Sequence, residues 1–268
     1  MMFTLFTYAF MQRAFVAGAL LGLLLASLGV IASLRRMTFF GEGIAHASLA
    51  GIAIAVLFGW APLPIAILWA ILVATIIFFL ERSTKLPTDT LIGMLFTASM
   101  AFGIILIHFL PGYQPELLTY LFGSILAIST QDVWITAILT LVILGWFFSS
   151  LRGLTFASLS EESAQVAGID VGKQTYLFYI ALAVTTVLGV KILGIILVPA
   201  LLVLPTATSR VLATSFKNYV IGSILFAECF MMAGLVFSYL LDLPSGATIV
   251  LVGALIFLVA TLIRPSRS

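Results

Sequence analysis

Charged residues are scarce in this chain of 268 residues: Asp, Glu, Lys and Arg together make up only 8%. Soluble domains carry roughly 25% charged residues, so the composition excludes a water-soluble globular protein. The formal net charge is +2 and the basic residues stand singly or in pairs, which excludes a nucleic-acid-binding protein. A single cysteine, Cys229, excludes an intrachain disulfide.

Hydrophobic residues dominate instead, at 63% of the chain with a mean hydropathy of +1.28. They stand in long blocks and not in the alternating pattern of a membrane β-barrel. A membrane-spanning helix needs about 20 such residues. We therefore predict an all-α, polytopic membrane protein. Because no repeat or linker divides the sequence, residues 1–268 are expected to form a single transmembrane domain.

The apolar blocks predict about nine transmembrane helices. A further segment, 117–128, is too short to span and is predicted to be re-entrant. The sixth and seventh blocks abut, and the distribution of Lys and Arg requires them to be separate spans. The nine blocks are 14–34, 39–60, 62–80, 88–110, 134–149, 176–190, 192–208, 219–241 and 247–263.

The Lys and Arg residues predict the orientation, because they favour cytoplasmic loops. With the N-terminus outside, nine spans leave only Arg13 and Lys191 on the outer side, and the C-terminus is cytoplasmic. The opposite orientation would invert this bias. The residues expected inside are Arg35, Arg36, Arg82, Lys85, Arg152, Lys173, Arg210, Lys217, Arg264 and Arg267.

Glu42 and His46 are the strongest functional candidates, because ionisable residues inside hydrocarbon are costly. Their spacing of four places both side chains on one helix face. A carboxylate and an imidazole there can share a divalent ion such as zinc, manganese or iron(II). At about 1.5 Å per residue, His46 lies about 15 Å from Arg36, near mid-membrane. Small neighbouring residues would let other helices approach closely.

A structural interpretation of the pair remains open. Glu42 can lie in the first turn of its helix, where the helix dipole favours an acid, while His46 bonds a neighbouring carbonyl. The spacing by itself does not decide between this interpretation and the metal site.

Glu228 is a second intramembrane acid, about 14 Å from the inner end of its span. It can complete the metal site, pair with a cation, or stay protonated and bond another helix. His108 stands at the outer end of its block, where an ordinary interfacial histidine is the simpler interpretation.

Two prolines mark the seventh block, Pro199 and Pro205. Each removes a backbone donor, and each is expected to kink or break the helix. Irregular backbone at membrane depth is tolerated where a water-filled cavity satisfies it. The block therefore belongs either to a translocation pathway or to a bent structural helix.

A polar stretch at 158–170 is predicted to contain a short helix on the inner side of the membrane. Ser160 can cap it, Glu161 and Glu162 would lie in its first turn, and Gly168 would end it. Such a helix is a natural dock for a partner protein, although an ordinary surface loop with one helical turn is the alternative.

No sequence signature of catalysis is present. Residues 168–173 (GIDVGK) faintly resemble a phosphate-binding loop, but the glycine spacing is one short and Gln174 stands where Ser or Thr should bind magnesium. We therefore expect no ATP hydrolysis by this chain. No Ser-His-acid set and no zinc-protease motif appear either.

Over residues 14–263 the chain resembles the permease subunits of bacterial ABC importers for zinc, manganese or iron(II). Individually the motifs are weak, and it is their order and spacing that carry the resemblance. They are 35–37 (RRM), 40–48 (FGEGIAHAS), 120–126 (YLFGSIL), 162–169 (ESAQVAGI), 194–205 (GIILVPALLVLP) and 241–247 (LDLPSGA).

The resemblance implies a helical architecture similar to that of the vitamin B12-type ABC importers, in the bacterial plasma (inner) membrane. The family's acid-x-x-x-His pair, usually Asp and His, falls on Glu42 and His46. The segment with Ser160, Ala164 and Gly168 resembles the coupling helix that inserts into a cytoplasmic ATPase. The permease would work as a homodimer with two ATPase subunits and an extracellular or periplasmic metal-binding protein.

The leading hypothesis is thus a non-catalytic permease that imports a divalent metal, with zinc preferred over manganese or iron(II) and no permanent cofactor. Its expected ligands are Glu42 and His46, with Glu228 as a further candidate. Two rivals remain: a proton-coupled secondary transporter that works without an ATPase, and a membrane hydrolase that uses the same metal.

Overall fold

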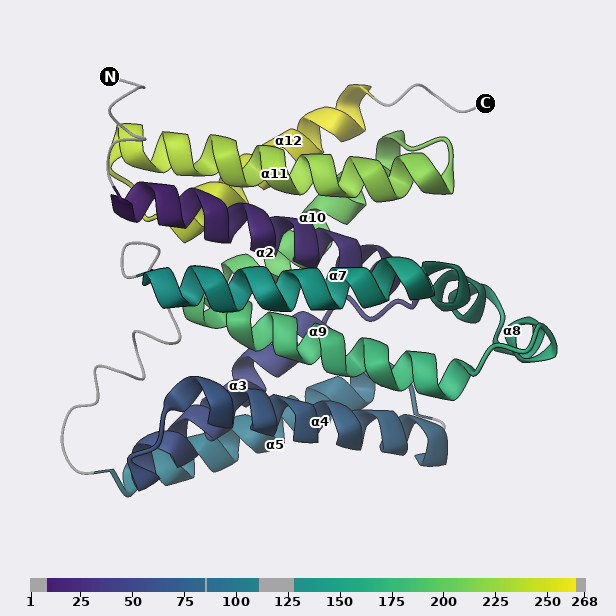
Figure 1. The fold of residues 1–268 in the computed structure, drawn as a ribbon, viewed down its shortest axis with the longest axis horizontal. Coiled ribbons are helices and arrows are strands. Elements are labelled where there is room, and N and C mark those ends of the chain that lie inside the picture. Colours follow the sequence, from purple (N-terminus) through teal and green to yellow (C-terminus); the bar gives the residue numbers. More distant parts are fainter. Residues whose placement is uncertain (1–8, 85, 111–127, 264–268) are drawn as a thin grey trace.

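The computed structural model describes residues 9–84, 86–110 and 128–263. Over these residues the chain is entirely helical (Figure 1). The elements are α2 (Ala9–Leu34), α3 (Phe40–Phe58), α4 (Pro62–Thr84), α5 (Thr88–His108), α7 (Thr130–Leu159), α8 (Glu161–Val166), α9 (Val171–Leu193), α10 (Leu197–Leu212), α11 (Phe216–Leu241) and α12 (Ser245–Ile263).

The all-α membrane architecture is confirmed. Eight of the described helices are long and apolar enough to cross a membrane. The ninth expected span corresponds to α10, an apolar helix of 16 residues. It is about 24 Å long, shorter than the roughly 30 Å hydrocarbon layer. The sixth and seventh blocks are separate helices, as expected, whereas most of the re-entrant segment 117–128 lies outside the described residues.

Several helices are longer than the apolar blocks that predicted them. The block 134–149 lies inside α7, which has 30 residues. Ser129 begins this helix with a capping box, in which its hydroxyl accepts from the backbone N–H of Asp132. Polar residues limit the apolar block that the sequence shows, but they do not end the helix. A capped helix can continue beyond the hydrocarbon layer.

The helices form neighbouring groups around a buried centre (Figure 1). Contacts link α3, α4 and α5 into one group and α2, α10, α11 and α12 into another, while α7 and α9 lie between them. Helix α2 supplies much of the core, through residues that include Leu21, Leu24, Leu25 and Leu28. Large apolar side chains on α4, α5, α7 and α12 face outward, as a lipid-facing surface requires.

Neither proline of the seventh block breaks helix α10. Pro199 lies in its first turn, where a backbone N–H has no intrahelical partner. Pro205 lies inside the helix, which nevertheless continues to Leu212. The chain leaves helical geometry before α10, at Gly194, which ends α9 and whose φ of 86° favours glycine. Pro205 therefore does not end the helix.

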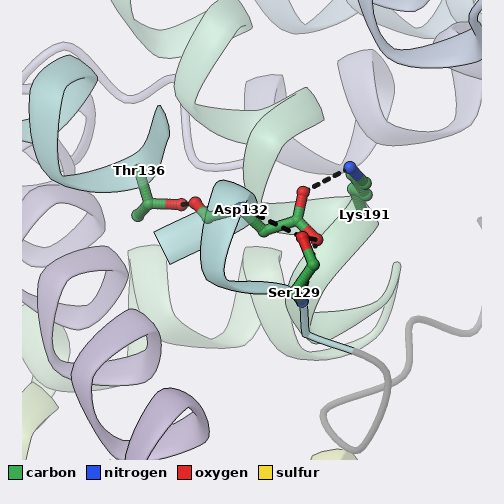
Figure 2. A network of polar contacts seen from close by, with 4 residues as sticks. All are labelled: Ser129, Asp132, Thr136 and Lys191. Carbon is green, nitrogen blue, oxygen red and sulfur yellow. Dashed lines mark hydrogen bonds and ion pairs between the residues drawn. The ribbon is translucent and has the colours of Figure 1, made fainter. Parts of the chain in front are cut away.

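An ion pair joins the beginning of α7 to the end of α9 (Figure 2). Lys191 Nζ lies 2.5 Å from Asp132 Oδ1, and both side chains are largely buried, at 27% and 13% exposed. The other carboxylate oxygen accepts from the Ser129 hydroxyl at 2.8 Å. Asp132 thus both caps its own helix and neutralises Lys191.

Gly29 generates the first prediction. A Cβ there would lie 2.2 Å from the backbone oxygen of Leu202, so α2 and α10 must separate in a Gly29→Ala variant. Overpacking of this kind costs about 1–3 kcal/mol. We expect a lower melting temperature in detergent, measured by loss of the monodisperse peak after heating. Gly93→Ala is the control, because a Cβ there meets nothing within 4 Å; equal melting temperatures for the two variants would contradict the packing argument.

The ion pair gives a second prediction. Lys191→Met and Asp132→Asn each remove the same interaction, so each should lower the free energy of unfolding by about 1–2 kcal/mol, allowing for partial exposure. The double variant should be scarcely less stable than either single variant. Lys217→Met, at an exposed lysine, is the control. Additive losses in the double variant would show that the two residues act independently.

Candidate metal-binding site

The site helix α3 begins at a tight turn. Arg36 has a φ of 59°, and the backbone N–H of Met37 donates to the carbonyl of Ala32 at 2.9 Å. Phe39, the residue before the helix, makes no side-chain cap, so the turn itself positions the first residues. Gly59 ends the helix in the left-handed conformation. This places Glu42 in the first turn and His46 one turn later.

Glu42 and His46 lie on the open side of an otherwise buried helix. Gly41, Gly43 and Ala45 around them are buried, whereas Glu42 is exposed and His46 is half-buried. Neither side chain makes a hydrogen bond to any described residue, so His46 does not bond a neighbouring carbonyl as the structural interpretation required. Both polar groups remain available to a ligand.

Packing against α5 fixes the orientation of this face. The His46 ring contacts the Phe96 ring, with centroids 5.5 Å apart. The Ser99 hydroxyl donates to the carbonyl of Ala47 at 2.9 Å, and the Trp69 indole of α4 donates to Ser99 at 2.8 Å. A hydrogen bond from α5, itself supported by α4, therefore holds the backbone beside His46 in place.

Glu228 does not join the pair within one chain. It lies on α11, with Oε1 3.4 Å from the position that a Cβ would take on Gly22 of α2. Helix α11 packs against α2, α10 and α12, whereas α3 packs mainly against α4 and α5. In the described part of the chain no three His, Cys, Asp or Glu side chains gather where they could hold a metal. Among the described residues of one chain, the candidate site therefore consists of Glu42 and His46 alone.

The short helix expected at 160–168 is present as α8. Ser160 caps it by accepting from the backbone N–H of Ser163 at 3.2 Å, and Glu161 and Glu162 are exposed in its first turn. Ala164 is fully buried against α7 and α9. Gly168, with a φ of 78°, follows the helix. The local structure that the sequence predicted is therefore confirmed.

Two apolar side chains beside this helix are turned outward. Val166 is 89% exposed and Leu159 is 75% exposed, at the end of the bundle from which α8 projects (Figure 1). His108 is exposed at the last residue of α5, in agreement with the interfacial position expected of it.

Two polar clusters of the structure were not predicted from the sequence. One is the Asp132–Lys191 pair, for which the Ser-x-x-Asp capping pattern and the isolated outer lysine were the available signals. The other surrounds Arg35, close to α8, and includes Glu81 and Tyr179. Its members are far apart in the sequence, so no spacing could have brought them together.

Comparison with known proteins places these features in a family. A model of the ABC 3 transport family matches residues 7–264. The chain is 33% identical over 263 residues to the manganese transport system membrane protein MntC of Halalkalibacterium halodurans, covering 98% of this chain and 90% of the relative. It is 28% identical to the high-affinity zinc uptake system membrane protein ZnuB of Haemophilus influenzae, with 92% and 95% covered.

A solved structure agrees with these matches. PsaBC from Streptococcus pneumoniae, determined in complex with a Fab, superposes with a TM-score of 0.85 and 30% identity, covering 98% of this chain and 95% of the other. The resemblance that the sequence motifs indicated is thereby confirmed, and this chain belongs to the ABC 3 transport family of metal-ion ABC transporter permeases.

Proposed function

We propose that this chain translocates a divalent transition metal ion as the membrane subunit of an ATP-driven importer, and that Glu42 and His46 bind the ion on its way. The observation that carries the proposal is the exposed Glu42 carboxylate beside His46 on a buried helix. A carboxylate that faced lipid would be costly. An aqueous path between two copies of the chain would remove that cost, so we propose a homodimer with the pathway at its interface.

The number of ligands suits transport. A complete four-ligand cage would hold the ion too tightly for release, whereas two ligands supplement water or a second copy's pair. Manganese, zinc and iron(II) all accept carboxylate and imidazole. The relatives carry the names of manganese and zinc systems, so the proposal covers both metals and does not retain a preference for zinc.

The energy for import would come from partner subunits, and its direction from the orientation of the chain in the membrane. ATP would be hydrolysed by separate subunits docked at α8, through the exposed acids Glu161 and Glu162 and around the buried Ala164. A metal-binding protein would deliver the ion at the opposite end of the bundle. The N-terminus would lie outside and the C-terminus in the cytoplasm of a bacterium. Membership of an ABC family over nearly the whole chain does not favour the proton-coupled alternative.

His46→Ala tests the site. In the complete transporter, reconstituted in proteoliposomes, loss of the imidazole should lower metal uptake by more than about tenfold, because one of two ligands is gone. Uptake of radioactive manganese and zinc measures the effect.

His108→Ala is the matched control, since His46 and His108 are the only histidines of the chain. It should leave uptake unchanged. Normal uptake by His46→Ala, in protein that still reaches the membrane, would refute the metal site.

Reversing charge on α8 tests the docking role. A Glu161→Lys, Glu162→Lys double variant should lose the co-purified ATPase subunit, because lysines would replace the exposed acids and oppose the helix dipole in the first turn. Asp89→Lys, which reverses the charge of an exposed acid on α5 and not on α8, is the control. An unchanged complex with the double variant would show that the ATPase docks elsewhere.

A further inference from the structure

A cluster of polar side chains lies where α2, α4, α7 and α9 end or begin beside α8. Arg35 is at its centre and follows α2 directly, in the tight turn that leads to α3. The backbone N–H of Arg35 donates to Ile31 at 3.0 Å, and that of Phe40 donates to Met37 at 3.2 Å. The turn is short and hydrogen-bonded, so its position sets that of the first residues of α3.

The Arg35 side chain reaches both helices that flank α8. Its Nη2 donates to the Thr175 hydroxyl of α9 at 3.0 Å, and its Nε donates to the Ser158 hydroxyl of α7 at 3.3 Å. Ser158 stands two residues before Ser160, the cap of α8. One guanidinium thus ties the chain on either side of α8 to the turn before the metal-site helix.

A second set of bonds extends the cluster to α4 and α5. The Tyr179 hydroxyl of α9 donates to Glu81 of α4 at 2.6 Å, and the Thr88 hydroxyl of α5 donates to the other oxygen of the same carboxylate. The Tyr179 ring also packs on Phe40, the first residue of α3, with centroids 5.2 Å apart. The cluster therefore touches α3 itself and three of the helices that pack on it, α4, α5 and α9.

Electrostatics makes Arg35 sensitive to the position of α8. Burial lowers the pKa of the guanidinium, while Tyr179, Glu161 and Glu81 act in the opposite direction. An arginine stays ionised even so. Glu161 belongs to α8 itself, so a displacement of α8 changes the field at Arg35.

Between α8 and the turn lies space and not a packed core. A cavity of about 340 Å³ is bordered by Arg35, Arg36, Glu81, Ser160 and Glu161. Apolar side chains therefore do not fill this gap, whereas the hydrogen bonds of Arg35 join the chain on either side of α8 to the turn.

We propose that Arg35 is a positioning residue that couples the movement of α8 to α3, and thereby to Glu42 and His46. This inference rests on the proposed function. Without the guanidinium, α8 and the adjoining ends of α7 and α9 still move with the ATPase, but the metal-site helix no longer follows. ATP is then hydrolysed without a matching transport of metal.

The test is the number of ATP molecules hydrolysed per metal ion taken up, in the complete transporter in proteoliposomes. An Arg35→Gln variant should keep its ATPase subunit and its affinity for metal, measured by manganese and zinc titration, yet raise this ratio by at least about fivefold. Arg35→Lys should fall between, because an ammonium keeps the charge but lacks the planar fork that reaches two hydroxyls.

Arg36→Gln is the matched control, since Arg36 is the adjacent arginine and is exposed; its ratio should equal that of the unaltered protein. If hydrolysis and uptake fall in proportion in Arg35→Gln, the coupling role is overturned. If that variant does not fold, a Ser158→Ala, Thr175→Val double variant removes the two acceptors and decides: a raised ratio supports the coupling role, and an unchanged ratio overturns it. The proposed function fails separately, if His46→Ala transports metal normally.

Discussion

The penalty for burying a charge without a partner, in protein or in hydrocarbon, is the constraint on which this structure depends. It explains why Lys191 is paired with Asp132, and why Arg35 is enclosed by hydroxyls and flanked by acids. Glu42 is the contrast, because it is exposed on a membrane-spanning helix with no partner among the described residues. A charge left in that position needs water, a metal or another chain, and this need points to a pathway for ions.

The two polar clusters lie at opposite ends of helix α9. At one end the ion pair holds the end of α9 to the beginning of α7. At the other, Arg35 and Tyr179 join the beginning of α9 to the turn before α3 and to Glu81 of α4. Helix α9 thus runs between two fixed ends, beside the group that contains the proposed ligands. Such a helix can carry a displacement along its length, since a packed helix moves as a unit.

The fold could largely be predicted from residue type and order. Long apolar blocks predicted the helices, and the Ser160 cap with Glu161 and Glu162 predicted α8. The spacing of Glu42 and His46 correctly placed them on one face. Pro199 and Pro205 were expected to kink or break the helix, and neither ends α10, because Pro199 lies in the first turn and the helix continues past Pro205. The chain leaves helical geometry at Gly194, between α9 and α10. Several helices, α7 most of all, extend beyond their apolar blocks, because hydropathy reports which residues lie in the bilayer and not where a helix ends.

Local chemistry along the chain therefore determined the class of protein, its helices and its pair of candidate ligands. Only the tertiary structure decided that Glu228 lies at the α2–α11 contact of its own chain, and that Arg35 meets Ser158 and Thr175. The physical reason is the distance along the sequence over which each interaction acts. Hydrophobic periodicity and helix caps act within a few residues, whereas a hydrogen bond between residues more than a hundred positions apart depends on how whole helices pack.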